Sequence, residues 1–487
     1  MISWLVLACS GLGPQVPPQL DSGFPKAPET TEPSTDPGTP FSEVRAAALD
    51  VYGSIVRVEW VQSEAATVHV EFFDRDEPER VLSTPPRDLE PGFHEELLIG
   101  MPYGSEFEWV IVTSQVTSRL RTVQNSPIPP TVPTAEVLAY DPDSVDPDSP
   151  YFLVGVTENG SLQRTWILLL DREGQVLWAH RTPNQRNSMQ PRVSLDGTSF
   201  LVDHSSYFAN LASQGEDSEI VELKIDGRVV RSWDAPGQHH PFVELPDGRI
   251  AYARYDFGLW RDDRIEIISE FGNDLTTLFS CRQFIEDNGL PLGNCGSNTT
   301  SYDATRDTFL FSMFTFDSVL EIDARTGEVE HVFSGDLSDP SRTGLPAWGF
   351  SPPSSRFDYQ HNPIWTEAGT LLLSTHVSEE SNELVVREYR VDEGSDTLEQ
   401  IWSFGEGEGI PGCQMGEAHR LAGGNTLHNY GTYARLREVT PDRRVVWDIQ
   451  WEDRQYSCGG GPQTPGHQVV RSNPVGPDLY RFAPERR

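Results

Sequence analysis

Basic side chains are scarce in this chain of 487 residues: Lys+Arg number 37 against 74 Asp+Glu, which gives a formal net charge of -37 at pH 7. A protein that binds nucleic acid by neutralising phosphates needs a basic face, so this charge excludes that class. Docking onto anionic lipid through a polybasic patch is equally disfavoured. The only lysines are Lys26 and Lys224. Neither lies in a glycine-rich phosphate loop, so a P-loop mechanism is excluded.

Long apolar runs are also missing. Beyond the first nine residues the longest strongly apolar run is 166–170, whereas a helix that spans a bilayer needs about 20 such residues. Long helix-forming stretches are absent, while Gly (40) and Pro (38) are frequent. With 37% hydrophobic and 10% aromatic residues the chain can still bury a large core. This composition favours an all-β fold.

The first nine residues are apolar and end in Val6, Leu7, Ala8 and Cys9. This pattern resembles the lipobox of a bacterial lipoprotein signal, in which Cys9 would be acylated; a buried N-terminal strand is the alternative. The apolar part is short and has no basic residue before it, which is typical of a signal truncated at its start. Residues 10–41 are rich in Pro, Ser, Thr and Gly, as expected of a solvated tether. We therefore expect an exported protein, anchored by lipid at the periplasmic or outer-membrane face of a bacterial cell envelope.

Four further cysteines are present, Cys281, Cys295, Cys413 and Cys458. An even number in an exported chain predicts two disulfides, and the local pairs Cys281/Cys295 and Cys413/Cys458 are the first of three connectivities to consider. No Cys-x-x-Cys spacing occurs, so no zinc site is expected.

Residues 42–133 contain short segments in which apolar and polar residues alternate, at 55–61, 67–72 and 106–112. A period of two with turn residues between the segments predicts antiparallel strands with one buried face. We predict a small immunoglobulin- or fibronectin-like β-sandwich here.

Residues 134–487 contain a repeated element: a strand, a turn with Asp or Gly, and a second strand that often holds Trp or Phe, as at 168–178 and 223–233. It occurs six times, and successive copies are about 45 to 65 residues apart. A second element alternates with it, a turn followed by an apolar strand, as at 196–202 and 247–252. Two hairpin elements per repeat make a four-stranded blade, and six repeats predict a six-bladed β-propeller.

One position in each repeat is expected to face the central channel of such a propeller. Eight residues before the turn glycine of successive repeats stand Met189, His240, His361 and Gly416. Two histidines at equivalent positions predict that His240 and His361 meet in one solvent-accessible pocket at the centre.

Several segments together resemble bacterial arylsulfotransferases. Residues 238–248 are similar to the His-His-Asp…Leu-Pro-Asn-Gly element of that family, and residues 357–363 are similar to its Gln-His nucleophile segment. Residues 298–310 and 320–329 resemble the blade between them, and the resemblance covers roughly residues 42–460. It implies an N-terminal sandwich before a six-bladed propeller, and ping-pong transfer of a sulfuryl group from a phenolic sulfate ester to another phenol.

The resemblance also implies roles for particular residues. His361 would attack sulfur to form a sulfohistidine, because a neutral imidazole is nucleophilic near pH 7. His240, or its neighbour His239, would hydrogen-bond the sulfate oxygens or protonate the departing phenolate. Asn298 and Gln360 would contact the substrate. The expected partners are aryl sulfates and phenols, with no nucleic acid, no cofactor and no metal, and the only membrane contact would be the lipid anchor.

Two departures from the family pattern support a second hypothesis. Gly296 stands where the family has a further histidine, and Phe314 stands where it has an anion-binding arginine. A sulfate ester that enters so acidic a protein needs a local positive charge. The candidates to supply it are Arg192, Arg254, Arg356 and His376. The alternative is a catalytically degenerate propeller that acts as a cell-surface binding or scaffold protein.

Overall fold

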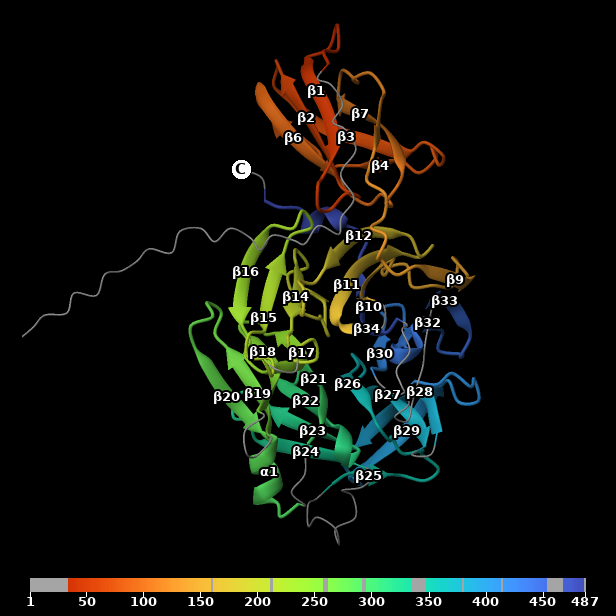
Figure 1. Cartoon of the computed structure of the whole chain (residues 1–487). Helices are drawn as coiled ribbons and strands as arrows, with labels where there is room; N and C mark the ends of the chain where they lie inside the picture. The colour runs from red at the N-terminus through yellow and green to blue at the C-terminus, as the bar shows by residue number, and fades with distance from the viewer. Residues whose placement is uncertain are drawn as a thin grey trace, which may run out of the picture.

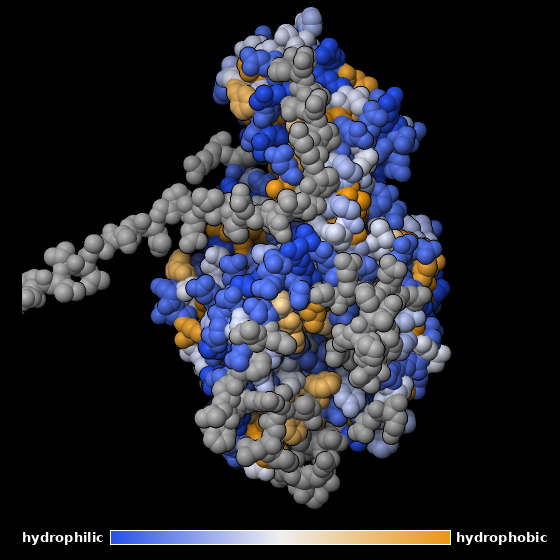
Figure 2. Space-filling model, in the orientation of Figure 1, coloured by the Kyte–Doolittle hydropathy of each residue, from blue (hydrophilic) through white to orange (hydrophobic). Residues whose placement is uncertain are grey.

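The computed structural model describes residues 34–158, 161–210, 213–256, 262–290, 295–334, 347–378, 381–412, 415–452 and 467–485. Within these ranges the chain is nearly all β: it forms strands β1 to β34, one α-helix and three 3-10 helices. The prediction of an all-β protein is confirmed. No helix of the described residues is long and apolar enough to cross a membrane. The face shown in Figure 2 is largely hydrophilic, as the high content of acidic residues requires.

The N-terminal strands form two sheets that enclose one core. The first contains β1 (Phe41–Ala48), β2 (Val56–Gln62) and β6 (Gly92–Leu98); the second contains β3 (Ala66–Asp74), β4 (Leu82–Ser83), β5 (Arg87–Leu89), β7 (Glu106–Thr113) and β8 (Arg121–Gln124). Alternate residues such as Val58 and Trp60 on β2 pack against Val70 and Phe72 on β3. Because side chains of a strand alternate between its two faces, the period of two in the sequence reflects this shared core.

The end of the predicted tether is part of this β structure. Ser34 forms an isolated bridge with Val44, and Asp36 is only 3% exposed. Its carboxylate accepts from Arg121 Nη1 at 3.0 Å and pairs with Arg119 Nε at 3.2 Å. A buried carboxylate needs such partners, so the expected boundary at residue 41 is wrong and ordered structure begins by residue 34. Cys9 and residues 10–33 lie outside the described residues.

Six further sheets follow, each containing a run of four antiparallel strands (Figure 1). They are, in strand order, β12 (Val176–Arg181), β11 (Ser161–Asp171), β10 (Tyr151–Glu158) and β34 (Val469–Val475); β13 (Arg192–Val193), β14 (Phe200–His204), β15 (Glu219–Leu223) and β16 (Val229–Asp234); β17 (Gln238–Glu244), β18 (Ile250–Asp256), β19 (Asp262–Ile268) and β20 (Leu275–Ser280); β21 (Ser297–Asp303), β22 (Thr308–Met313), β23 (Ser318–Asp323) and β24 (Val329–Ser334); β26 (His361–Trp365), β27 (Leu371–Ser378), β28 (Ser381–Asp392) and β29 (Thr397–Phe404), with β25 (Gly349–Phe350) added in parallel; and β30 (Glu417–Arg420), β31 (Thr426–Asn429), β32 (Arg435–Val439) and β33 (Val445–Trp451), with β9 (Ala135–Tyr140) at the edge. The 3-10 helices η1 (Phe314–Phe316), η2 (Gly431–Tyr433) and η3 (Leu479–Phe482) lie in the connections.

The two ends of this region are exchanged between neighbouring sheets. The C-terminal strand β34 pairs with β10, while β9, which precedes β10 in the chain, pairs with β33. At the other edge of the sheets, β17 contacts β21, β21 contacts β26, and β26 contacts β30. The inner strands β34, β13, β17, β21, β26 and β30 are therefore brought around one centre, and the exchanged ends hold the first and last sheets together.

Tyr52 fastens the N-terminal sheets to the rest of the chain. Its hydroxyl lies 2.9 Å from His180 Nδ1, and its ring stacks on Trp178 with the centroids 5.4 Å apart. The same ring covers Gly227, whose φ is 84°; a Cβ on this glycine would lie 2.0 Å from the tyrosine ring. Only glycine tolerates both that backbone conformation and that close approach.

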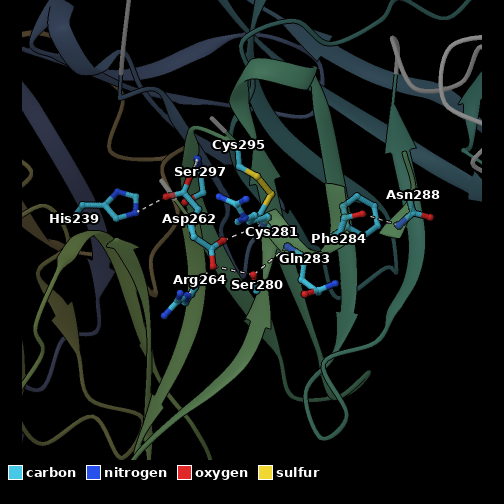
Figure 3. The surroundings of a disulfide bond; sticks show 12 residues. His239, Asp262, Arg264, Ser280, Cys281, Gln283, Phe284, Asn288, Cys295 and Ser297 are labelled. Carbon is cyan, nitrogen blue, oxygen red and sulfur yellow. Dashed lines mark hydrogen bonds and ion pairs between the residues drawn. A yellow bond between two sulfur atoms is a disulfide. The ribbon is translucent and has the colours of Figure 1, made fainter. Parts of the chain in front are cut away.

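A disulfide joins Cys281, the first residue of helix α1 (Cys281–Asp287), to Cys295, which follows the helix in the chain (Figure 3). Ser280 caps the helix by accepting from Gln283 N at 3.1 Å, and Asp262 Oδ1 accepts from Arg282 N at 2.9 Å. The predicted pair Cys281/Cys295 is confirmed. The predicted pair Cys413/Cys458 lies outside the described residues.

Removing this disulfide tests how far it supports the fold. The sequence separation of the two cysteines is 14, and a loop of that size predicts a loss of about 3 kcal/mol in the free energy of unfolding. We expect the double variant Cys281→Ser/Cys295→Ser to unfold at lower denaturant concentration than the oxidised wild type, measured by tryptophan fluorescence in urea. Equal midpoints would show that the cross-link contributes nothing to stability.

Candidate functional site

The four residues that share one position in the repeats line a single hollow at the centre of the sheets. Met189, His240, His361 and Gly416 all contribute to it, and its empty space is about 390 Å³, open solvent included. We call it the histidine hollow. His240 and His361 are separated by 121 positions in the sequence and come from β17 and β26, yet they meet here, as the repeat register predicted.

Irregular backbone at the starts of the inner strands directs these residues toward the centre. The pairing register shifts between Gln238 and Phe242 in β17, between Ser297 and Thr299 in β21, and between His361 and Ile364 in β26. A bulge re-aims the side chains of the strand that contains it, and bulges are frequent next to functional sites.

His240 is backed by a second histidine and a buried carboxylate. The Nδ1 atoms of His240 and His239 are in hydrogen-bond contact, and His239 Nε2 lies 3.2 Å from Asp263 Oδ1. The other oxygen of Asp263 accepts from Ser297 N at 3.0 Å. An Nε2 proton on His239 faces the carboxylate, so Nδ1 of His239 is left to accept from His240. Figure 3 shows His239 beside the sheet that carries the disulfide.

His239 lies behind His240 and does not line the hollow. Its side chain is buried, at 3% exposure. It is placed to orient His240, and its predicted contact with substrate stays a prediction.

Aromatic rings stand against both histidines of the hollow. Phe314 meets His361 edge to face with the ring centroids 6.2 Å apart, and Phe208 meets His240 in the same way at 5.2 Å. Phe314 occupies the position at which the family has an arginine, so an apolar ring replaces a charge next to His361. Neither phenylalanine lines the hollow itself, and both pack on the histidines from behind.

Both histidines of the hollow are neutral at pH 7. Burial, followed by the proximity of His376, lowers the pKa of His361 to about 3 against the opposing effect of Glu417. Burial, followed by the proximity of His239 and His361, lowers the pKa of His240 well below its usual value. A neutral imidazole keeps a nitrogen lone pair, which a nucleophile or a general base requires.

Asn298 lines the hollow, whereas Gln360 does not. Asn298 Nδ2 donates to the carbonyl oxygen of Gln360 at 2.8 Å. The side chain of Gln360 is fully buried and donates to Ser312 Oγ at 3.1 Å and to Ser318 O at 2.9 Å. The Gln360 side chain therefore lies inside the sheet with its Nε2 engaged, and its backbone supports the hollow; its predicted contact with substrate stays a prediction.

Arg471 supplies the positive charge in the wall of the hollow, although the sequence analysis predicted other residues for this role. It lines the hollow from β34, donates from Nη1 to Asn362 Oδ1 at 2.7 Å, and holds Nε 2.8 Å from Glu417 Oε2. Burial alone would raise the pKa of Glu417, but Arg471 and His419 lower it to about 2. Arg471 is thus held by an ionised partner in the wall of the hollow.

The four cations proposed from the sequence lie elsewhere among the described residues. Arg254 faces Glu216 at 3.8 Å, the Arg356 carbonyl accepts from Arg387, and His376 Nε2 contacts Gly412 O at 2.8 Å. Arg192 lies beyond Arg471, in a second hollow. The repeat pattern does not identify Arg471. It aligns residues that belong to consecutive hairpins, whereas β34 lies at the C-terminal end of the chain and pairs with β10 near the start of the domain.

One group of three possible metal ligands occurs in the described part of the chain, Glu321, Glu330 and His331. Glu321 Oε1 already accepts from Arg306 Nε at 2.9 Å and from Trp365 Nε1 at 3.1 Å. His331 Nδ1 lies 2.7 Å from its other oxygen. An arginine this close competes with a cation for the carboxylate, so the group is explained as an ion-pair cluster.

No family model and no curated protein matches the chain. Similar solved structures include a protein of unknown function from Bacteroides caccae, with 13% identity, a TM-score of 0.42, and coverage of 67% of this chain and 99% of that one. The periplasmic gluconolactonase of Pseudomonas aeruginosa has 13% identity, a TM-score of 0.37, and coverage of 84% and 97%. Virginiamycin B lyase from Staphylococcus aureus has 12% identity, a TM-score of 0.35, and coverage of 69% and 98%. Similarity at this level carries no conclusion about activity.

The depressed pKa of His361 predicts a specific pH dependence of stability. Its pKa is about 3 in the folded protein, against an ordinary value of 6.5, so between these pH values the unfolded state binds more protons and the free energy of unfolding falls as pH falls. His361→Gln removes this contribution. We expect the difference in unfolding free energy between wild type and variant to move by about 1 to 2 kcal/mol in favour of the variant between pH 7 and pH 5. Urea denaturation at both pH values measures it, and a constant difference would mean that His361 is not buried as a neutral group.

Proposed function

We propose that this chain is an arylsulfotransferase-like enzyme that transfers a sulfuryl group from an aryl sulfate ester to a phenol through a sulfohistidine on His361. The observation that carries the proposal is the shared hollow, in which two neutral imidazoles, His361 and His240, face one space whose wall contains Arg471. The proposal joins this geometry to the resemblance of residues 238–248 and 357–363 to that family.

The proposed scaffold is a six-bladed β-propeller preceded by a β-sandwich. Six sheets of at least four strands, inner strands that contact one another in sequence, and exchange of β9 and β34 between neighbouring sheets support the propeller. Two N-terminal sheets with one common core support the sandwich. Export and a lipid anchor at Cys9 remain part of the proposal, and the Cys281–Cys295 disulfide agrees with an oxidising compartment.

In the first half-reaction a nitrogen of His361 attacks sulfur. The N–S bond forms while the bond from sulfur to the aryl oxygen breaks, and its electron pair leaves on the phenolate. In the second half-reaction an acceptor phenol attacks the same sulfur, the N–S bond breaks, and His361 is regenerated. The phenolate leaves unprotonated in the first half-reaction. His240 is neutral and oriented by His239 and Asp263, so it is placed to take the proton from the incoming phenol in the second.

Two features of the hollow fit an aryl sulfate. Phe208 and Phe314 pack on His240 and His361 behind the lining, and Met189, Pro241 and Val470 give the hollow apolar surface for the aryl group. Arg471 offers positive charge to the sulfate, which a chain with a net charge of -37 would otherwise repel. The alternative, a binding or scaffold protein that has lost turnover, is favoured by Gly296 and Phe314 at the family's histidine and arginine positions.

Turnover of 4-nitrophenyl sulfate with phenol as acceptor separates the two functions. We expect release of 4-nitrophenolate by the wild type and a loss of at least about a hundredfold in His361→Ala. Between pH 7.5 and pH 5 the rate should not fall through protonation of His361, because its pKa is about 3. His94→Ala, on strand β6 of the N-terminal sheets, is the matched control and should keep wild-type activity. No release by the folded wild type with any aryl sulfate would favour the scaffold alternative.

The Asp263→Asn variant tests whether the carboxylate positions His239 and His240. It keeps the size of the side chain and removes the charge that His239 Nε2 faces at 3.2 Å, so we expect the rate to fall by roughly tenfold to a hundredfold, as for other outer partners of a functional histidine. The size of the rate loss should depend on the acceptor, and the pH profile of the second half-reaction should change. The burst of 4-nitrophenolate should be retained, because 4-nitrophenolate is a good leaving group. An unchanged pH profile with a uniform loss would assign Asp263 a purely structural role.

A further inference from the structure

A second hollow lies further along the same inner strands. It is lined by residues that follow those of the histidine hollow, such as Ile364 and Trp365 after His361, and Tyr302 after Asn298. It holds about 1100 Å³ of empty space, open solvent included. Since a strand rises about 3.3 Å per residue, about 10 Å separate the two hollows. We call the second one the arginine hollow, after Arg192.

A polar layer divides the two hollows, and Arg471 lines both. With the amide of Gln190 oriented so that both of its ends are satisfied, Oε1 accepts from Arg192 Nη2 at 2.6 Å, from Arg192 Nε at 2.7 Å and from Arg471 Nη2 at 3.0 Å. Two guanidinium groups therefore converge on a single neutral oxygen. This arrangement concentrates positive charge at one end of the arginine hollow.

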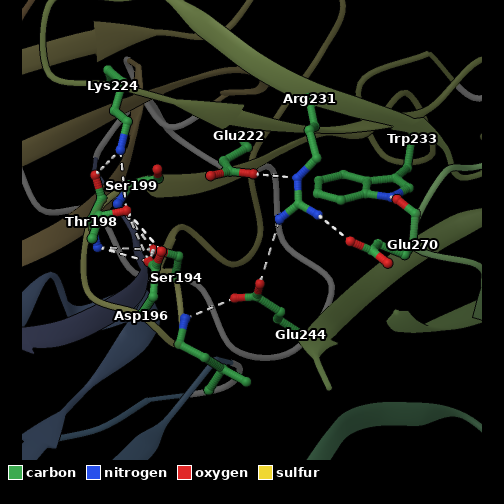
Figure 4. A network of polar contacts seen from close by, with 11 residues as sticks. Ser194, Asp196, Thr198, Ser199, Glu222, Lys224, Arg231, Trp233, Glu244 and Glu270 are labelled. Carbon is green, nitrogen blue, oxygen red and sulfur yellow. Dashed lines mark hydrogen bonds and ion pairs between the residues drawn. The ribbon is translucent and has the colours of Figure 1, made fainter. Parts of the chain in front are cut away.

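The carboxylates nearest to this charge are already engaged. Glu417 is shared between Arg471, at 2.8 Å, and His419, at 3.5 Å. Glu244 accepts from Leu195 N at 2.7 Å and faces Arg231 at 3.7 Å, as Figure 4 shows.

The other carboxylate of the lining, Asp303, is also occupied, because it accepts from the backbone N–H groups of Thr305 and Arg306 at 2.9 and 2.8 Å. In the part of the chain that the structure describes, no carboxylate lies within ion-pair distance of Arg192.

The charge of Arg192 is consequently poorly compensated. Burial and, next, the repulsion from Arg471 lower the pKa of Arg192 to about 9, against the opposing effect of Glu417 and Glu244. Arg192 is half-buried, and a cation withdrawn from water without an ion-pair partner is costly. An anion bound in the arginine hollow would offset this cost. The net negative charge of the protein repels anions in general, so the local positive charge of Arg192 is what would attract an anion to this site.

The remaining walls define what kind of anion fits. They are largely apolar, with Trp365 and Tyr302 on one side and Val243, Leu195 and Ile364 among the others. We propose that the arginine hollow binds a small organic monoanion, an aromatic carboxylate or sulfonate in size and character, whose charge pairs with Arg192 and whose ring packs on these walls. This site is separate from the histidine hollow, and its occupancy does not depend on sulfuryl transfer.

Benzoate and benzamide are matched probes for this site, because they share one ring and differ in charge. In calorimetric titrations of the full chain we expect saturable binding of benzoate and none of benzamide. R192Q should weaken benzoate binding at least tenfold. R249Q is the matched control and should leave binding unchanged, since Arg249 is a surface residue paired with Asp247 at 2.7 Å, outside the hollow.

The outcomes separate this site from the proposed active site. H361A should retain benzoate binding, whereas loss in H361A with retention in R192Q would place the ligand in the histidine hollow and overturn the proposal. Equal binding of benzamide, or no saturable binding of benzoate by the folded wild type, would overturn it as well. If R192Q fails to fold, hydrogen exchange of the wild type decides: benzoate should protect the backbone of 192–195 and 364–365, and unchanged exchange there refutes the site. No sulfate ester is present, so an inactive enzyme that binds benzoate contradicts only the proposed reaction.

Discussion

The pairing of β34 with β10 is the constraint on which the rest of the structure depends. It takes the last strand of the chain into the sheet that contains β10, β11 and β12, so the two ends of the domain are joined. The same pairing carries Arg471 to that centre, where it meets Glu417 from β30. Without Arg471, Glu417 would be a buried carboxylate that lacks its nearest cation, and such a group costs several kcal/mol. The pairing that joins the two ends of the domain therefore also places the positive charge of Arg471 in the wall of the histidine hollow.

Charge at the centre is arranged in layers along the inner strands. Neutral imidazoles line one hollow, a polar layer built around Arg471, Asn362 and Glu417 lies beneath it, and Arg192 stands in the next hollow. Burial keeps the histidines unprotonated, while the ion pair keeps Glu417 charged. A strongly acidic protein therefore presents its few inward cations where an anion could use them. Arg471 is held at the centre by its ion pair with Glu417, and Arg192 by its hydrogen bonds to Gln190, so these positive charges do not require a basic surface.

The parts of this architecture that could be predicted from the sequence are those that repeat. Alternation of apolar residues identified the strands because one face of each sheet is buried, and the turn glycines aligned Met189, His240, His361 and Gly416 because equivalent strand positions face the same centre. Side-chain direction could not be read in this way. The bulge at the start of β26 is invisible to a periodic pattern, and Gln360, predicted to face substrate, turns into the sheet. Arg471 was missed because its strand pairs across the whole length of the domain, a contact that no local signal reports.

The central claim is that His361 forms a covalent bond to sulfur in the histidine hollow, and covalent trapping tests it most directly. The protein is incubated with an aryl sulfate in the absence of any acceptor, quenched in base, and analysed by intact and peptide mass spectrometry. The account predicts a mass gain of one sulfuryl group, located on His361 and discharged when phenol is added. An unmodified protein after release of the phenol, or the group on another residue, would contradict it.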